Sequence, residues 1–199
     1  MTLLIDADYL IYNSCCACEQ DTRWNEWEHT LHTDERDIMN LIENRLAFYQ
    51  SVAGSKHDVV MCFSSYPTFR HEIFPEYKIN RLGKRKPLAL KDIIKKIKDE
   101  YNSEYLDGLE GDDVLGLLAT SNKYKDPIIV SVDKDMRTIP CKLLAGDDLE
   151  LINKRQADRN WMKQACSGDP TDNYKGIPGV GLVGADLSLI HISEPTRPY

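Results

Sequence analysis

The sequence lacks several features that define whole classes of protein. Its 199 residues contain no apolar run long enough to cross a bilayer, and no signal-peptide pattern precedes the first apolar segment. The six cysteines lack zinc-ribbon spacing, and without an export signal we expect them to be reduced thiols. None of the five histidines falls in a cluster of polar residues, and no Ser or His nucleophile is indicated. We therefore expect a cytoplasmic protein (host cytoplasm, if a phage encodes it) that makes no contact with membranes.

Positive charge is scarce overall but concentrated in one segment. The formal net charge is −7, which argues against a general coat for nucleic acid. Between Lys78 and Lys98, however, nine residues are Lys or Arg and only Asp92 is acidic, so this window carries +8 and the remainder carries −15. A basic segment on an acidic body suits a protein that grips phosphates in one place and concentrates metal ions in another.

Apolar runs and helical periodicities alternate along the chain. Short apolar runs that are typical of buried strands lie at 3–5, 58–63, 127–132, 141–146 and 149–153, and helical patterns lie at 34–54, 90–101, 112–124 and 154–166. Residues 20–34 are polar and read as a loop or a short helix. Strands that alternate with helices predict an α/β protein with a mostly parallel central sheet flanked by helices.

Carboxylates recur in four tight groups, each next to a predicted element: Asp6 and Asp8; Glu110, Asp112 and Asp113; Asp133 and Asp135; Asp169 and Asp172. Asp6 and Asp133 come just after predicted strands, at the sheet edge where ligands collect in α/β proteins. Two carboxylates about 4 Å apart repel by roughly 1 kcal/mol in water and about 4 kcal/mol at an effective dielectric of 20, so a cluster needs protons or cations. A pair of divalent cations is one solution, and it serves phosphodiester hydrolysis. The spacing alone leaves open four unrelated helix caps and turns.

Five motifs, taken in order, point to a family. The segments LLIDAD, PTFRHEIFPEYKINR, LEGDDVLG, SVDKDMRTIP and GDPTDNYKGIPGVG resemble the flap endonuclease and 5′→3′ exonuclease superfamily, in particular the phage 5′→3′ exonucleases. The resemblance runs from about Leu3 to Gly184, and the joint pattern is highly specific although each motif alone is weak. It implies a PIN-like 5′-nuclease domain with a helical arch and a helix–two-turn–helix module, which is truncated here.

The resemblance implies roles for the acidic residues. Asp6, Glu110, Asp112 and Asp113 would hold or orient the metal at the cleavage site, and Asp133, Asp135, Asp169 and Asp172 would complete a cluster for two Mg²⁺ or Mn²⁺ ions. Asp8 matches no essential ligand, and we interpret it as supporting the site indirectly or as capping a helix.

The resemblance also implies roles for basic and aromatic residues. Arg70, Lys78 and Arg81 match the family's basic patch, and we expect them, with Asp112, to be the catalytic residues, Lys78 near the scissile phosphate. Tyr77 could stack on the terminal base. Lys84, Arg85, Lys86 and the Lys91–Lys98 helix would form the arch and contact phosphates. For Lys95, Lys96 and Lys98, a solvated helix face remains an equally good interpretation.

The last motif resembles the first hairpin of the duplex-gripping module. Gly176, Gly179 and Gly181 would let backbone amides approach DNA phosphates, and K⁺ commonly sits at this hairpin in relatives. The expected domains are a nuclease body over 1–168 with an arch region over 70–100, and the start of the DNA-binding module over 169–186. Residues 187–197, LSLIHISEPTR, resemble translated sequencing adapter, so we expect 187–199 to be an artefactual tail.

One departure keeps alternatives open. Family members usually carry an Asp just after the second strand, where this chain has Ser64 and Ser65. We expect a metal-dependent 5′→3′ exonuclease or flap endonuclease, active as a monomer on duplex or flap DNA with a free 5′ end, and in some relatives on RNA–DNA hybrids. The alternatives are a catalytically weakened, structure-specific DNA-binding protein and a PIN-type ribonuclease. A haloacid-dehalogenase-type phosphatase would leave three of the acidic motifs unexplained.

Overall fold

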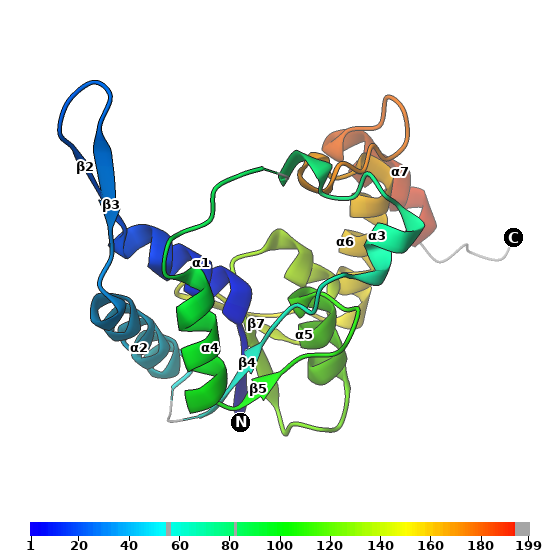
Figure 1. The fold of residues 1–199 in the computed structure, drawn as a ribbon. Helices are drawn as coiled ribbons and strands as arrows, with labels where there is room; N and C mark the ends of the chain where they lie inside the picture. Colours follow the sequence, from blue (N-terminus) through cyan, green and yellow to red (C-terminus); the bar gives the residue numbers. More distant parts are fainter. Residues whose placement is uncertain (55–56, 82, 194–199) are drawn as a thin grey trace, which may run out of the picture.

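A six-stranded sheet forms the centre of the molecule (Figure 1). The computed structural model describes residues 1–54, 57–81 and 83–193. The strand order is β5-β4-β1-β6-β7-β8, and every pair is parallel except β7 with β8. The strands are β1 (Thr2–Asp6), β4 (Asp58–Cys62), β5 (Ser103–Glu104), β6 (Pro127–Val130), β7 (Lys142–Ala145) and β8 (Asp148–Leu151). The predicted α/β class with a mostly parallel sheet is confirmed.

Helices cover both faces of this sheet, because its central strands are apolar on both sides. On one face, α1 (Ala7–Cys18), α2 (Glu35–Val52) and α4 (Leu90–Glu100) pack against Leu3 and Ile5 of β1. On the other face, α5 (Gly111–Thr120) and α6 (Lys154–Ser167) pack over Leu4 of β1 and Ile129 of β6. Successive residues of β1 therefore serve opposite layers, as a strand buried on both faces requires.

The prediction for residues 20–34 is wrong. They form an antiparallel hairpin of β2 (Gln20–Arg23) and β3 (His29–His32), which projects from the body between α1 and α2 (Figure 1). Its tip is closed by Asn25, whose side-chain oxygen accepts hydrogen bonds from the backbone N–H groups of Trp27 and Glu28. Almost every residue of these two strands is exposed, so no alternation of apolar and polar residues marks them in the sequence.

The arch region also differs from the expectation. From β4 the chain rises through α3 (Phe69–Ile73) and the short 3-10 helix η1 (Ile79–Arg81), then crosses above the sheet to α4 (Figure 1). Helix α4 is not part of that crossing segment, since Ile93 and Ile97 are fully buried in the core beneath α1 and α2. Its lysines therefore lie on the outer face of a body helix, and only the residues before α4 arch over the sheet edge.

The carboxyl ends of β1, β4 and β6 lie at one edge, because these strands are parallel. Two 3-10 helices, η2 (Lys134–Thr138) and η3 (Pro170–Asp172), lie on the same side, and α6 pairs with α7 (Leu182–Ser193). Residues 187–193 of the adapter-like segment thus continue a helix, and residues 194–199 lie outside the described residues. In the described part of the chain, no helix has the length and apolar character needed to span a membrane.

Candidate active site

Asp6 and Asp133 are joined through one serine at the ends of two neighbouring strands. Asp6 ends β1 and caps α1, accepting a hydrogen bond from Tyr9 N at 3.1 Å. Ser131 Oγ donates to Asp6 Oδ2 at 2.8 Å and accepts from Asp133 N at 3.1 Å. Burial, together with the charges of Asp8 and Asp133, raises the pKa of Asp6 to about 6 despite those hydrogen bonds. The two carboxylates are therefore close enough to repel each other.

Asp112 brings a third carboxyl to the same place from the other layer. It lies in the first turn of α5, which begins beside the end of β4. Burial, and then the charges of Asp6 and Asp133, raises its pKa to about 8, against an opposing effect of Lys78. In the metal-free protein at neutral pH, Asp112 therefore keeps its proton more often than not.

Asp135, Asp169 and Asp172 form the second half of the cluster. Asp135 belongs to η2, and burial, with the charge of Asp133, raises its pKa. Asp169 is 7% exposed, caps η3 through Thr171 N at 2.8 Å, and also raises the pKa of Asp135. Asp172 closes η3 and lies opposite η1. Predicted ligands from four distant segments thus converge at one edge of the sheet.

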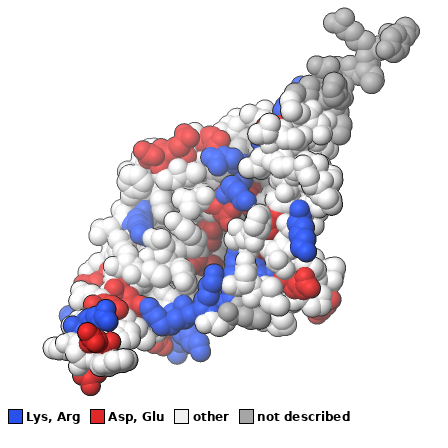
Figure 2. All heavy atoms as spheres, turned by 90° about the horizontal axis from the view of Figure 1, so that it is seen from above, with Lys and Arg blue, Asp and Glu red and all other residues white. Residues whose placement is uncertain are grey.

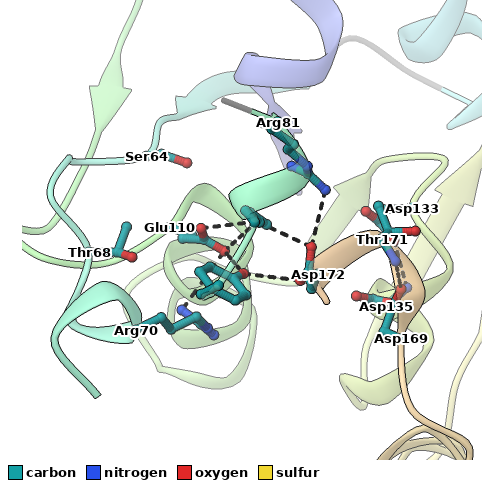
Figure 3. A network of polar contacts seen from close by, with 12 residues as sticks. Ser64, Thr68, Arg70, Arg81, Glu110, Asp133, Asp135, Asp169, Thr171 and Asp172 are labelled. Carbon is teal, nitrogen blue, oxygen red and sulfur yellow. Dashed lines mark hydrogen bonds and ion pairs between the residues drawn. The ribbon is translucent and has the colours of Figure 1, made fainter. Parts of the chain in front are cut away.

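Lys78 and Tyr77 reach into this cluster from the arching segment and contact Glu110 and Asp172, two acids that are labelled in Figure 3. Lys78 Nζ lies 2.9 Å from Glu110 Oε2 and 3.8 Å from Asp172 Oδ1. The Tyr77 hydroxyl donates to Glu110 Oε2 at 2.8 Å or to Asp172 Oδ2 at 3.0 Å. Lys78 adopts a left-handed backbone conformation with φ of 53°, which costs energy for a residue with a side chain and fits a position held by its surroundings.

Three more cations pair with acids of this site, and two of them, Arg70 and Arg81, are labelled in Figure 3. Arg70 on α3 binds Asp113 with both terminal nitrogens, and its hydrogen bond holds the pKa of Asp113 below the usual range although burial alone would raise it. Arg81 contacts Asp172 at 3.1 Å, and Lys134 contacts Asp169 at 2.9 Å. Seen from above, Asp and Glu line a hollow in the middle of the face, with Lys and Arg on several sides of it (Figure 2).

The donor set fits hard divalent cations, although the side chains are not yet arranged around one. Within the described ranges, no three His, Cys, Asp or Glu side chains are gathered in the spacing of a metal site. Four of the predicted ligands instead face cations of the protein itself: Lys78 pairs with Glu110, Arg70 with Asp113, Arg81 with Asp172 and Lys134 with Asp169. The donors that lie together are all carboxylate oxygens, and Mg²⁺ and Mn²⁺ prefer such ligands.

Some predicted residues lie elsewhere. Asp8 does not cap α1, because Asp6 does, and its carboxylate instead accepts a hydrogen bond from Ser64 N at 2.9 Å. Lys84, Arg85 and Lys86 are exposed on the segment that leads to α4, and Arg85 forms an ion pair with Glu19 at the base of the β2–β3 hairpin. None of the three is among the residues that contact the acidic cluster within the described part of the chain.

The three glycines of the GIPGVG hairpin differ in what surrounds them. A Cβ on Gly176 would lie 2.4 Å from Gly168 N, so the chain itself requires glycine there. Gly179 has a φ of 78° in open space, and Gly181 is also open but needs no special conformation. Only the last two therefore leave room for a phosphate.

The structure adds residues that the sequence did not indicate. Ser131 links Asp6 to Asp133, Lys134 neutralises Asp169, and Gln164 of α6 donates a hydrogen bond to Asp135. Ser131 and Lys134 lie inside the SVDKD motif, so their nearness to Asp133 was a usable signal. Gln164 had no such signal. Beside Asp135, Asp169 and Asp172 opens a cleft of about 380 Å³, whose apolar walls include Phe69 and Trp161.

Comparison with known proteins agrees with this geometry. The family model described as 5′-3′ exonuclease, N-terminal resolvase-like domain, matches residues 1–165. The chain is 29% identical to the exonuclease of Escherichia phage T7 over 97% of its own length and 68% of the relative's. It is also 29% identical to the exodeoxyribonuclease of Enterobacteria phage T3, covering 90% of this chain and 63% of the relative.

Solved structures share the fold. The flap endonuclease of bacteriophage T5, in a complex with DNA and metal ions, superposes with a TM-score of 0.66 at 16% identity, covering 96% of this chain and 74% of that one. The central sheet and its flanking helices are thus those of a PIN-like 5′-nuclease fold, and the resemblance carried by the five motifs is confirmed.

Proposed function

Because the chain belongs to the family of 5′-3′ exonuclease N-terminal, resolvase-like domains, we propose that it hydrolyses phosphodiester bonds near the 5′ end of DNA with divalent cations, Mg²⁺ or Mn²⁺. The observation that carries the proposal is the convergence of Asp6, Asp112 and Asp133, from two strand ends and one helix start. They lie so close that the charges of Asp6 and Asp133 raise the pKa of Asp112, and the charge of Asp133 raises the pKa of Asp6. Such crowding opposes folding unless cations relieve it, and a phosphodiesterase needs those cations in that place.

The acidic residues divide into two groups around the proposed ions. Asp6, Glu110, Asp112 and Asp113 would hold or orient the ion at the cleavage site, and Asp133, Asp135, Asp169 and Asp172 would complete a site for two. Bound there, divalent cations supply polarisation of the scissile phosphate and a water of lowered pKa. A carboxyl must lose its proton before it binds a cation. For Asp112, the raised pKa of about 8 opposes that loss at neutral pH.

Lys78 is the group best placed to act on the substrate. Its side chain is only 15% exposed, and its ammonium is shared between Glu110 and Asp172. When cations neutralise those two carboxylates, the ammonium becomes available to the phosphate oxygens on which charge develops during hydrolysis. Tyr77 and Arg81, which lie against the same acids, would orient the strand, and Arg70 would keep α3 in place through Asp113.

The proposed substrates follow from relatives and from charge. The two phage relatives are named as an exonuclease and an exodeoxyribonuclease, and the phage T5 neighbour is a flap endonuclease with DNA. We extend this to duplex or flap DNA with a free 5′ end, in phage DNA replication or host-DNA breakdown, with RNA–DNA hybrids as a further substrate and a monomer as the active form. Lys84, Arg85 and Lys86 would contact phosphates, and the Gly176–Gly181 hairpin would grip duplex, with K⁺ as its ion.

Ser64 and Ser65 support a second candidate, a structure-specific DNA-binding protein that no longer cleaves. Ser64 Oγ accepts a hydrogen bond from Gly111 N at 2.8 Å, so this serine fastens the start of α5 to the end of β4 rather than offering a charge. On this alternative, structured DNA would bind and stay intact.

The deciding experiment uses 5′-labelled duplex, flap and RNA–DNA substrates with Mg²⁺, Mn²⁺ or EDTA. We expect 5′-terminal mono- or oligonucleotides to be released from DNA only with a divalent metal. Asp133→Asn should reduce the rate by at least about 100-fold, because the residue would hold a cation that acts on the scissile phosphate. Its melting temperature should not fall, since one repulsive charge has been removed. Binding without cleavage would favour the second candidate, and cleavage confined to RNA would indicate a PIN-type ribonuclease.

A further inference from the structure

The site lacks a charge where the family pattern places one, and the two residues at that position have other tasks. Ser64 Oγ is occupied by Gly111 N at the start of α5. Ser65 donates its backbone N–H to Leu109 O at 2.8 Å, and its hydroxyl lies 3.5 Å from Asp107 Oδ1. Neither side chain can supply the negative charge of a carboxylate, so the edge of the sheet beside β4 would be one charge short.

Asp8 places a carboxylate against that same point from a different element. It projects from the first turn of α1, and its Oδ2 accepts the hydrogen bond of Ser64 N at 2.9 Å. Gly111 leaves room for this approach, because a Cβ there would lie only 3.3 Å from Asp8 Oδ2. The start of α5, the end of β4 and the start of α1 therefore meet at this carboxylate.

The charge of Asp8 is not cancelled by a neighbour. Among the described residues, Asp8 Oδ1 makes no hydrogen bond and Asp8 forms no ion pair, whereas Asp113 and Asp169 are each paired with a cation. Asp8 also lies close enough to Asp6 for its charge to act on the Asp6 carboxyl. A partly buried carboxylate with a free oxygen beside other acids is unfavourable unless a cation shares it.

We infer that Asp8 replaces the missing acid after β4 and contributes its charge to binding of the divalent cations. The inference rests on the proposed function, since it assigns a residue to that same site. It goes beyond the family pattern, in which this position is not an essential ligand and the charge comes from the strand end. In this chain the carboxylate would come from the first turn of α1 instead of the residue after β4, and it lies against the backbone N–H of Ser64.

Asp8→Asn is the sharpest test, because asparagine keeps an oxygen that accepts from Ser64 N and removes only the charge. The measurement is Mn²⁺ binding to the DNA-free protein by titration calorimetry, which does not depend on activity. We expect the affinity to fall about 10-fold or more, the usual range when a group supporting a metal site is lost. Asp107→Asn, at an exposed acid bonded to Ser65, is the matched control and should bind Mn²⁺ as the parent does.

Asp133→Asn separates the failure of this inference from the failure of the proposed function. If Asp133→Asn loses Mn²⁺ affinity and Asp8→Asn does not, the role of Asp8 is overturned while the metal site stands. If neither loses affinity, the metal site itself is overturned, and the inference with it. A loss in both, with Asp107→Asn unchanged, supports the inference.

Placing a carboxylate after β4 again tests directly whether Asp8 replaces the acid that is missing there. This test does not require Asp8→Asn to be fully stable. Ser64→Asp and Ser65→Asp are each combined with Asp8→Asn. At least one combination should recover Mn²⁺ affinity to within about threefold of the parent, because the charge is restored near the same point. No recovery in either combination would overturn the replacement.

Discussion

Among the described residues, Asp112 is in no ion pair, in contrast to Glu110 and Asp113 beside it. Arg70 pairs with Asp113 and Lys78 with Glu110, whereas Asp112 is half-buried near other acids. Burial, and then the charges of Asp6 and Asp133, raises its pKa to about 8. Asp6 is in the same position with a pKa of about 6. In the unfolded chain both carboxyls return to an ordinary value near 3.8. The folded metal-free protein therefore binds more protons than the unfolded chain between these values.

This difference sets the sign of a pH dependence. A group whose pKa is raised on folding loses stability as pH rises, so metal-free protein in EDTA should melt progressively lower from about pH 4 to about pH 8. Asp112→Asn removes the larger shift, and the gain in stability should grow with pH to the order of a few kcal/mol at pH 8. Thermal melts of both proteins across that range test this. If the melting temperatures of parent and variant change with pH in parallel, folding does not raise the pKa of Asp112.

The acids themselves could be predicted, but not their partners. Strand ends and helix starts can be located from apolar runs and periodicity, so the sheet-edge positions of Asp6 and Asp133 followed from the sequence. The contact of Lys78 and Tyr77 with Glu110 could not follow, because it depends on a left-handed residue inside an irregular segment. For Asp8 the sequence left open a supporting role at the site or a helix cap. The structure removes the cap of α1, and the contact with Ser64 had no signal because that residue lies 56 positions away.

At the scale of elements, amphipathic helices and buried strands were predictable, and exposed or two-faced ones were not. The strands β1, β4 and β6 are short apolar runs covered on both faces, which leaves an unambiguous signal. The β2–β3 hairpin buries almost nothing and left none. Helix α4 combines a lysine-rich face with buried isoleucines. Its lysines led to the prediction that it belongs to the arch, whereas its isoleucines pack in the core.

The turn that joins α6 to the GIPGVG hairpin is an element built on close backbone approach. Gly168 and Gly176, both with positive φ, face each other so closely that neither accepts a side chain. Between them, Asp169 and Tyr174 exchange two backbone hydrogen bonds at 2.7 and 2.8 Å. This turn fixes where Asp169 and Asp172 stand, so the hairpin and the acidic cluster share one support.

Alanine substitutions within the GIPGVG motif should distinguish a glycine that the fold requires from a glycine that is proposed to contact DNA. Gly176→Ala must move Gly168 or Cys166, and we expect it to destabilise the protein by about 1–3 kcal/mol and to weaken Mn²⁺ binding. Gly181→Ala meets open space without a positive φ, so its melting temperature should stay within about 2 °C of the parent. If Gly181 approaches a phosphate, that variant should nevertheless lose affinity for duplex DNA. Equal melting temperatures for the two variants would contradict the packing.

At the scale of the whole molecule, the acidic residues and the exposed lysines of the arching segment lie in different places. The acids gather at the sheet edge, while Lys84 and Lys86 lie exposed beyond Arg81 on the way to α4. Arg81 faces Asp172 and Arg85 faces Glu19, so those two cations are already engaged within the protein. A net charge of −7 therefore does not oppose the proposed DNA binding, because Lys84 and Lys86 lie exposed close together on one segment.

Salt dependence of DNA binding tests this separation. If Lys84 and Lys86 each contact one phosphate, Lys84→Ala with Lys86→Ala should lower the slope of log affinity against log salt by about 2, and weaken binding to all sequences alike. Fluorescence anisotropy with a labelled flap in Ca²⁺ or EDTA would measure it. Lys125→Ala is the matched control, since it lies just before β6, where the strand begins, at the edge opposite the acids. An equal change in slope for the control would mean that the molecule attracts DNA through its overall charge. An unchanged slope in the double variant would mean that Lys84 and Lys86 do not contact phosphates.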